Sequence, residues 1–250
     1  MAGAVAAGTE SLAAPDKLQA LAEHAAACPR CRLAETRTQV VFGSGSPTAQ
    51  LMFVGEAPGF HEDQQGVPFV GAAGKLLERL LGEIGLSRAD VYIANVLKCR
   101  PPGNRDPQPD EIEACQPWLF QQIELIQPRV IATLGNFSTR LLSGNPAGIT
   151  RVHGVAQDIV VGSTRVVLFP IYHPAAALYT PALLRLLEED FRKLPALLGG
   201  GQGGGEGGGE GGGDAGGEGG AVAAAPAVAT PAPLPAAPAP AAETVQLGLF

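Results

Sequence analysis

The placement of four cysteines, the only ones in the chain, is the feature that most constrains its fold. Cys28 and Cys31 form a C-x2-C pair, whereas Cys99 and Cys115 lie far downstream. Thiols so far apart can meet only if the chain between them folds back on itself. Four cysteines are the usual ligand set of a 4Fe–4S cluster and also of structural zinc. Disulfides or free thiols are the alternative, but a chain without a secretory signal fits a reduced compartment better.

Composition divides the chain near residue 198. Residues 199–220 are mostly glycine with spaced acidic residues, and residues 221–242 are mostly alanine, proline, valine and threonine. Neither stretch can bury enough apolar surface to offset the loss of chain entropy. We therefore predict a flexible N-terminus (1–14), one folded domain (15–196), a disordered linker (197–245) and a separate terminal segment (246–250).

The formal net charge of −7 does not suggest a nucleic-acid partner. All lysines and arginines lie before residue 194, and five acidic residues lie in the tail, so the folded part is nearly neutral. Its basic residues form two local clusters that are able to contact a few phosphates: Arg30, Arg32 and Arg37, and Lys98, Arg100 and Arg105. No apolar run is long enough to span a membrane, and we expect a cytoplasmic protein.

Short apolar runs alternate with segments of helical periodicity over the folded part. The runs predict strands at 51–54, 91–97, 129–134 and 165–171, the last paired in a hairpin with 155–161. Helices are expected at 15–27, 75–84, 110–126, 136–143 and 181–194, with a break near Pro117. Buried strands separated by helices indicate a parallel sheet covered on both faces. The predicted fold is a three-layer α/β/α domain around a mostly parallel, four-stranded sheet.

In such folds, ligands bind at the carboxyl ends of the strands. The predicted strand ends carry a Gly-Glu-Ala-Pro-Gly loop at 55–59, Asn95, a Gly-Asn pair at 135–136, and His173 followed by proline. The folded part contains neither a G-x-G-x-x-G nor a Walker A motif, so dinucleotide or nucleoside triphosphate binding has no local support.

Four motifs in order carry a resemblance to a known family: GEAPGFHED at 55–63, GVPFVG at 66–71, NVLKCRPPGN at 95–104, and His173-Pro174. Together with the cysteine spacing, they resemble the family 4 uracil-DNA glycosylases, the iron–sulfur branch of that superfamily, over about residues 28–194. Such enzymes hydrolyse the N-glycosidic bond of a deoxyuridine that has left the base stack. The resemblance implies a 4Fe–4S cluster on the four cysteines, single- or double-stranded uracil-containing DNA as substrate, and a nucleoid-associated monomer.

The resemblance also implies which residues bind uracil. Phe69 is expected to stack on the base, and backbone groups of Glu56, Ala57 and Gly59 to line the pocket. The Asn95 amide can donate to uracil O4 and accept from N3–H, a pairing that cytosine reverses. His173 is expected to donate to uracil O2, where negative charge grows as the base leaves.

Catalysis is expected to use carboxylates and an amide near the sugar. Glu62 is the first candidate to position the water or to stabilise the oxocarbenium ion, and Asp63 is the second. Asn104 aligns with a position near the attacking water, which is histidine in a covalent, DNA-crosslinking branch; asparagine here indicates ordinary turnover. Leu178, with Tyr179 as runner-up, is expected to fill the gap left by the flipped base. Ala175 stands where many members have serine, so no phosphate contact is expected from it.

The chain ends in apolar residues after a linker that has few of them. Gln246, Leu247, Leu249 and Phe250 resemble the short peptide by which bacterial repair proteins bind the DNA polymerase sliding clamp. A flexible tether of this kind raises local concentration without rigid docking. Two other functions remain open: a glycosylase of the same fold acting on other deaminated bases, and a non-catalytic iron–sulfur or zinc protein that binds DNA or the clamp. The joint presence of Phe69, Asn95 and His173 favours the enzyme, and Asn95 favours uracil.

Overall fold

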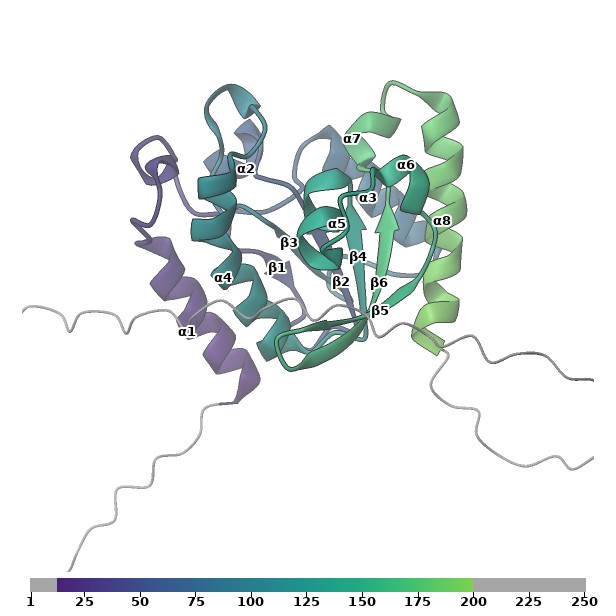
Figure 1. Cartoon of the computed structure of the whole chain (residues 1–250), viewed down its shortest axis with the longest axis horizontal. Coiled ribbons are helices and arrows are strands. Elements are labelled where there is room, and N and C mark those ends of the chain that lie inside the picture. Colours follow the sequence, from purple (N-terminus) through teal and green to yellow (C-terminus); the bar gives the residue numbers. More distant parts are fainter. Residues whose placement is uncertain (1–12, 200–250) are drawn as a thin grey trace, which may run out of the picture.

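A computed structural model describes residues 13–199, which form a mixed sheet between two layers of helices (Figure 1). Most of the predicted N-terminal segment, the chain beyond residue 199 and the predicted clamp-binding peptide lie outside the described residues. Within 13–199, no helix is both long and apolar enough to cross a membrane.

The sheet confirms the predicted α/β class and is wider than the predicted four strands. Its order is β1-β3-β2-β4-β6-β5, and the four inner strands run parallel. Both edge strands are antiparallel to their neighbours. The sequence predicted β5 as the hairpin partner of β6, but the two residues of β1 are too few to produce a pattern. The strands are β1 (Ser44–Gly45), β2 (Leu51–Gly55), β3 (Tyr92–Asn95), β4 (Val130–Leu134), β5 (Gln157–Val161) and β6 (Thr164–Ile171).

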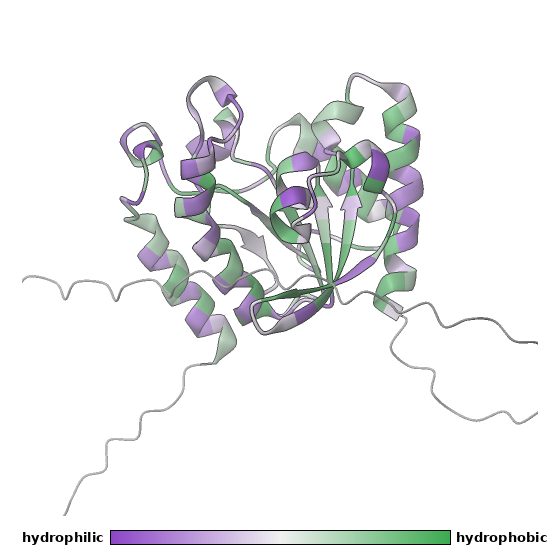
Figure 2. Cartoon of the chain, viewed as in Figure 1, coloured by the Kyte–Doolittle hydropathy of each residue, from purple (hydrophilic) through white to green (hydrophobic). Residues whose placement is uncertain are grey.

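Each face of the sheet has its own core, because successive side chains of a strand point to opposite faces. In β2, Met52 and Val54 pack against one face, and Leu51 and Phe53 pack against the other. The first face is covered by α1 (Ala14–Ala26), α4 (Pro109–Ile126) and α5 (Asn136–Ser143), and the second by α3 (Ala72–Glu83) and α8 (Pro181–Gly199). Figure 2 shows the strands as mainly apolar, whereas the helices mix polar and apolar residues.

Two helices continue past prolines. The expected break near Pro117 is wrong: α4 runs on to Ile126, because the residues after the proline are held by the core. Likewise α8 passes Pro195 and ends at Gly199, so the linker does not begin at 197 as predicted. Leu197 and Leu198 pack against the core, and Arg129 donates to the Leu198 carbonyl at 2.8 Å.

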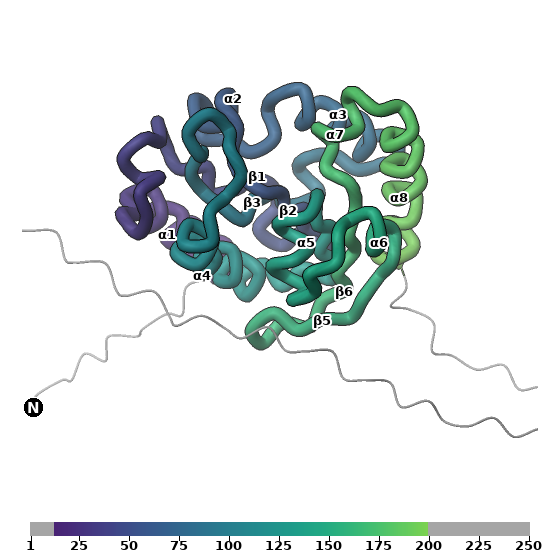
Figure 3. The backbone as a smooth tube through the Cα atoms, turned by 45° about the horizontal axis from the view of Figure 1, so that its top comes forward, coloured from purple at the N-terminus to yellow at the C-terminus, as the bar shows by residue number. Residues whose placement is uncertain are grey.

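The connections at one end of the sheet contain short helices that the sequence did not predict. These are α2 (Phe60–Gln65) and α7 (Pro174–Ala177), with α6 (Ile149–Val152) and the 3₁₀ turns η1 (Arg32–Glu35) and η2 (Pro102–Asn104) elsewhere in the loops. In Figure 1, α2 and α7 lie at the end of the sheet toward which β4 and β6 point, and Figure 3 shows both helices at the top of the molecule. This is the end where a doubly covered parallel sheet binds its ligands.

Candidate active site

A pocket of about 350 Å³ opens at the carboxyl ends of the parallel strands. Its volume lies in the range of small-molecule sites. It brings together most of the residues predicted from the sequence: Glu56, Ala57, Gly59, Glu62, Phe69, Asn95, Asn104 and His173. Its wall also includes Pro58, Ala73, Pro101, Arg105 and Ala175, of which Arg105 had been predicted only as part of a basic cluster.

Asn95 presents an amide that the protein leaves partly unpaired. It ends β3, and its Oδ1 is buried without a hydrogen-bond partner within the described part of the chain. A buried polar atom without a partner is costly, which is why most such atoms are satisfied. Gly55, on the neighbouring strand, makes room for it: a Cβ there would collide with Asn95 Oδ1 and with the Phe69 ring. The amide and the ring therefore converge on one space.

Phe69 is held in a strained backbone conformation. Its φ is 55°, in the left-handed region that non-glycine residues rarely adopt. Arg88 stabilises this conformation by donating to the carbonyls of Phe69 and Pro68, at 2.9 and 2.6 Å. Gly74 allows α3 to approach so closely that a Cβ there would overlap the Phe69 carbonyl. Backbone strain held by its surroundings is typical of functional sites.

His173 is fixed as a neutral donor. It caps α7, and its Nδ1 accepts from the Ala175 N–H at 3.1 Å, which leaves the proton on Nε2. Burial lowers the pKa of His173 to about 4, against a smaller opposing effect of the nearby Glu62 carboxylate. The imidazole is therefore neutral at physiological pH, and its ring stacks on Phe69 with a centroid distance of 5.6 Å.

The two adjacent carboxylates point in different directions. Glu62 lines the pocket and accepts from the backbone N–H groups of Gly59, Val70 and Gly71, at 3.1, 2.9 and 2.9 Å. Asp63 is buried outside the pocket wall, and both of its oxygens accept from the Thr38 N–H. The structure thus does not bring Asp63 to the site. Asp63 instead ties α2 to the loop after η1 that contains Thr38. Glu62 joins the two loops that shape the pocket.

Glu56 is the pocket residue whose charge is most easily changed. Burial, and to a lesser extent the carboxylate of Asp106, raise the pKa of Glu56 to about 7. Its side chain therefore exchanges a proton near neutral pH, unlike an ordinary glutamate. The sequence predicted only its backbone as part of the site.

The 101–105 wall of the pocket carries a second strained residue. Asn104 has a φ of 55°, and its Oδ1 accepts from Arg100 Nε at 2.6 Å. The Arg100 guanidinium in turn lies 5.2 Å from the centroid of the exposed Phe60 ring. Asn104 itself is exposed, with its side chain held in place at the pocket rim.

Leu178 and Tyr179 lie just after α7 and outside the pocket wall. They are 39% and 88% exposed, among the few large apolar side chains at the surface of residues 13–199. They belong to the same short segment as His173. This placement fits a side chain that would enter DNA rather than hold the base.

The four cysteines line a second, much smaller cavity between α1, α4 and the loop after β3. All four thiols are free, and Trp118 and Leu33 help to enclose them. Within 13–199, no three His, Cys, Asp or Glu side chains are close enough to hold a single metal ion. The four thiols nevertheless line the same cavity.

Hydrogen-bond donors are directed at two of these sulfurs. The Lys98 N–H donates to Cys115 Sγ at 3.2 Å, and Arg37 donates to Cys99 Sγ at 3.5 Å. Burial raises the pKa of Cys115 to about 12 and lowers that of Lys98 to about 7. Burial therefore disfavours the Cys115 thiolate and the Lys98 ammonium group. Thiolates in this cavity require a cationic group beside them for stability.

Three of the six residues in the two predicted basic clusters are engaged by other groups of the protein. Lys98 is buried and donates to the Asn95 carbonyl and to Gln122, at 2.8 and 2.6 Å. Arg37 donates to the Cys28 carbonyl at 2.7 Å, and Arg105 pairs with Glu111. These three side chains are therefore less available for phosphate contacts than the sequence clusters suggested.

Comparison with known proteins agrees with this geometry. The family model of the uracil DNA glycosylase superfamily matches residues 42–195, which include the pocket and most of the sheet. The chain therefore belongs to the uracil-DNA glycosylase superfamily. Its fold and strand-end pocket are those expected for that class.

Curated relatives narrow the class to one branch. The chain is 50% identical to a type-4 uracil-DNA glycosylase of Sulfurisphaera tokodaii, over 73% of this chain and 85% of the relative. Corresponding proteins of Archaeoglobus fulgidus and Thermotoga maritima are 48% and 42% identical, over 70% and 72% of this chain and 90% and 94% of theirs. The chain is a member of the type-4 uracil-DNA glycosylase family, which confirms the family predicted from its motifs.

Proposed function

We propose that the strand-end pocket binds a uracil flipped out of DNA and hydrolyses its N-glycosidic bond, the first step of base excision repair. The observation that carries this proposal is the unpaired Oδ1 of Asn95, which lies beside the Phe69 ring and in the same pocket as His173. Uracil N3–H can donate to this oxygen while the amide nitrogen donates to O4. Cytosine offers the reverse pattern and leaves the buried oxygen unsatisfied.

Bond cleavage leaves a uracil anion, and His173 is arranged to stabilise it. With Nδ1 occupied by the Ala175 N–H, the Nε2–H can donate to uracil O2. A donor already aimed at the oxygen on which charge develops lowers the barrier without reorganisation. Stacking on Phe69 keeps the departing ring in the plane of these hydrogen bonds.

The sugar side of the reaction is assigned to Glu62 and Asn104. Glu62 is held by three backbone N–H groups, and its carboxylate is placed to stabilise positive charge on the sugar and to orient the water. Asn104 also lines the pocket and can bind the same water. Both roles depend on fixed positions rather than on a mobile base.

Leu178 is the proposed wedge for the gap in the base stack, with Tyr179 beside it as the second candidate. An apolar side chain that enters a duplex compensates for lost stacking around the flipped nucleotide. Comparing excision by Leu178→Ala on single- and double-stranded substrates tests the role. Only the double-stranded reaction should slow, and equal slowing of both would argue against a wedge.

The test of the function is incubation of purified protein with an oligonucleotide that contains one uracil, followed by alkali to cleave at the abasic site. The same oligonucleotide with thymine or cytosine is the matched control. Excision of uracil alone, without added metal or nucleotide, is expected. An intact uracil strand under these conditions would refute the proposal.

The cysteine cavity is proposed to hold a 4Fe–4S cluster. Four thiols lining one cavity, with donors directed at two sulfurs, are the usual ligand set of such a cluster, and the motif resemblance favours it over zinc. Bound there, the cluster would supply the cationic partner that the buried thiolates need. It would also join the segment of Cys28 and Cys31 to the loop after β3. Hydrolysis needs no electrons, so this role is structural. Anaerobically purified protein should contain iron and absorb visible light, and zinc without iron would refute the cluster.

The C-terminal residues are proposed to bind the sliding clamp, with Leu249 and Phe250 as apolar anchors and Gln246 as a polar contact. This proposal rests on the sequence pattern and its place after a long linker. Calorimetry should show clamp binding by the full chain and by a free peptide of residues 246–250. Deleting them, or changing Leu249 and Phe250 to alanine, should abolish binding and leave excision on short oligonucleotides unchanged. Equal affinity of intact and truncated chains would reject the motif.

A further inference from the structure

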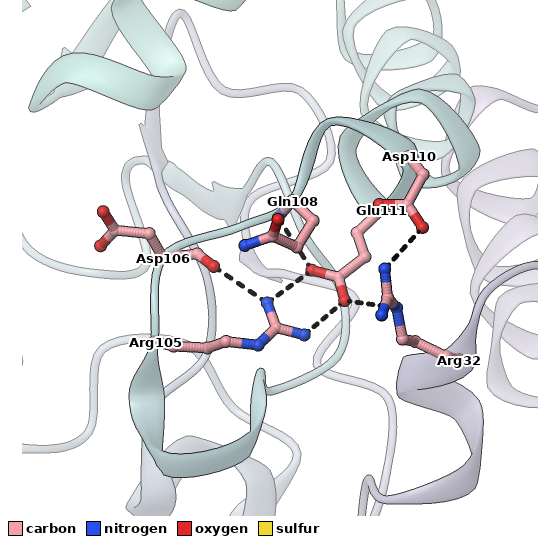
Figure 4. A network of polar contacts seen from close by, with 6 residues as sticks. All are labelled: Arg32, Arg105, Asp106, Gln108, Asp110 and Glu111. Carbon is pink, nitrogen blue, oxygen red and sulfur yellow. Dashed lines mark hydrogen bonds and ion pairs between the residues drawn. The ribbon is translucent and has the colours of Figure 1, made fainter.

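Outside the pocket and the cysteine cavity, Glu111 is the most completely buried carboxylate whose role the proposed reaction leaves open. It lies in the first turn of α4 with no exposed surface, and Figure 4 shows it between two arginines. Arg105 contacts both of its oxygens, at 2.6 and 2.9 Å, and the Gln108 N–H donates to it at 2.9 Å. Arg32 Nε lies 3.4 Å from Oε1 on the other side. These partners hold the pKa of Glu111 below its usual range, chiefly through the Arg105 hydrogen bond.

The two arginines come from different regions of the protein. Arg105 lines the pocket and follows Asn104 directly. Arg32 follows Cys31 directly, and it also contacts Asp110 at 2.9 Å. Glu111 itself lies one helical turn before Cys115 on α4. The Glu111 carboxylate thus contacts Arg105, which follows Asn104 of the pocket. It also contacts Arg32, which follows Cys31 of the cavity.

The wall that Arg105 anchors needs support. Gly103 and Asn104 both have positive φ values, 66° and 55°. Asparagine tolerates this conformation better than most residues do, but the position of an exposed turn still depends on how its ends are held. The Arg100–Asn104 hydrogen bond fixes the side chain, and the Arg105–Glu111 pair fixes the next residue. Without Glu111, Arg105 would be released and Asn104 would lose its defined position.

We propose that Glu111 is a positioning residue that couples the 101–105 wall of the pocket to the cysteine-bearing segment around Arg32. The proposal deepens the proposed glycosylase function and rests on it. A buried carboxylate shared by two cations links their positions, because moving either one removes a partner from a Glu111 oxygen that water does not reach. The link acts in both directions, as any thermodynamic coupling must.

The test uses two single variants. For each one, the property that is measured belongs to the site that the changed side chain does not contact. Arg32→Gln removes the partner near Cys31, and Arg105→Gln removes the partner at the pocket. Arg32 is 59% exposed, so its loss should leave the fold intact. The readouts are kcat and KM on a single-stranded uracil oligonucleotide, the rate of metal release to a chelator, and the thermal midpoint. Glu188→Gln is the matched control, because Glu188 also contacts two arginines, Arg79 and Arg192, but lies outside both sites.

Arg32→Gln should lower kcat roughly 3- to 30-fold with little change in KM, the range measured for coupling through side-chain networks. Arg105→Gln should speed metal release by a similar factor, although Arg105 does not line the cysteine cavity. Glu111→Gln should produce both effects, and Glu188→Gln neither. Wild-type kcat in Arg32→Gln together with wild-type metal release in Arg105→Gln would overturn the coupling, whatever Glu111→Gln does. Inactive wild-type protein would instead refute the glycosylase function, while metal release would still report on the coupling.

Discussion

The pocket and the cysteine cavity lie in the same domain but are built in opposite ways. The pocket is open, contains an unpaired buried oxygen on Asn95, and is walled by two residues in left-handed conformations. The cavity is small and enclosed, and donors from Lys98 and Arg37 point at its sulfurs. The difference suits a ligand that arrives and leaves in one case and a permanent occupant in the other. Unsatisfied groups are tolerated where a substrate completes them, whereas a structural site must be complete in the resting protein.

This contrast predicts that changes at the cavity act on stability, with the largest effect at a cysteine. Cys99→Ala should lower the free energy of unfolding by more than about 4 kcal/mol, because loss of a bound metal group is among the few changes that cost so much. The fraction that remains folded should still excise uracil, with a loss no larger than the roughly 3- to 30-fold expected through the Glu111 network. Thermal unfolding followed with iron analysis measures the first effect. Val155→Ala, at an exposed position, is the control, and a Cys99→Ala protein as stable as this control would break the contrast.

Changes at the pocket should act on chemistry and spare stability. His173→Ala should lower kcat about 10²–10³-fold, the usual cost of removing one preorganised donor to a developing anion. Iron content and thermal midpoint should stay at wild-type values. His173→Gln keeps a donor near the same place and should recover part of the rate. Unchanged excision in His173→Ala would remove this residue from the site.

Asn95→Asp should lower kcat/KM for uracil, which corresponds to a loss of about 1–3 kcal/mol of transition-state stabilisation. The reason is that a carboxylate cannot donate to uracil O4. The preference for uracil over cytosine should narrow, since a protonated aspartate presents a different pattern. Rates on matched uracil and cytosine oligonucleotides measure both effects. A selectivity identical to wild type would mean that another group reads the edge of the base.

The smallest effect concerns the pH dependence of stability. The pKa of Glu56 is raised from 4.5 to about 7 in the fold, so the unfolded chain releases this proton first. The contribution of Glu56 to the free energy of unfolding should therefore fall as pH rises from 4.5 through 7, because the fold disfavours the charged carboxylate. His173, whose pKa is lowered from 6.5 to about 4, has the opposite slope, so the comparison with Glu56→Gln isolates the carboxyl.

Urea unfolding at several pH values across this window measures the difference. Glu56→Gln should lack the decline that Glu56 causes, so its stability should gain on that of wild type as pH rises. Parallel curves for the two proteins would show that the Glu56 proton is not linked to folding.

The sequence predicted the parallel centre of the sheet because its strands are short apolar runs buried on both faces. It identified Asn95 as a site residue because a buried polar side chain at the end of such a run needs a hydrogen-bond partner. It ranked Glu62 above Asp63 only through the family resemblance, because it predicted no helix over residues 60–65. They form α2, where neighbours differ by about 100° in direction, and this turns Asp63 toward Thr38.

The Glu111 network was missed, although a weak signal for it exists. Gln108 and Glu111 have the spacing of a capping box at the start of a helix, and the structure contains that box. Nothing in the sequence shows that Arg32, so distant along the chain, meets the same carboxylate. Contacts between loops depend on tertiary packing, and a single sequence has no periodicity that reports them.

The hydrogen bond from the Ala175 N–H to His173 Nδ1 has a consequence for repeated turnover. The proton of the imidazole is assigned once, when the chain folds, and not anew for each base that enters. Between two catalytic cycles, the ring has neither to rotate nor to exchange its proton with solvent. The histidine is therefore already in its working tautomer when each new base enters the pocket.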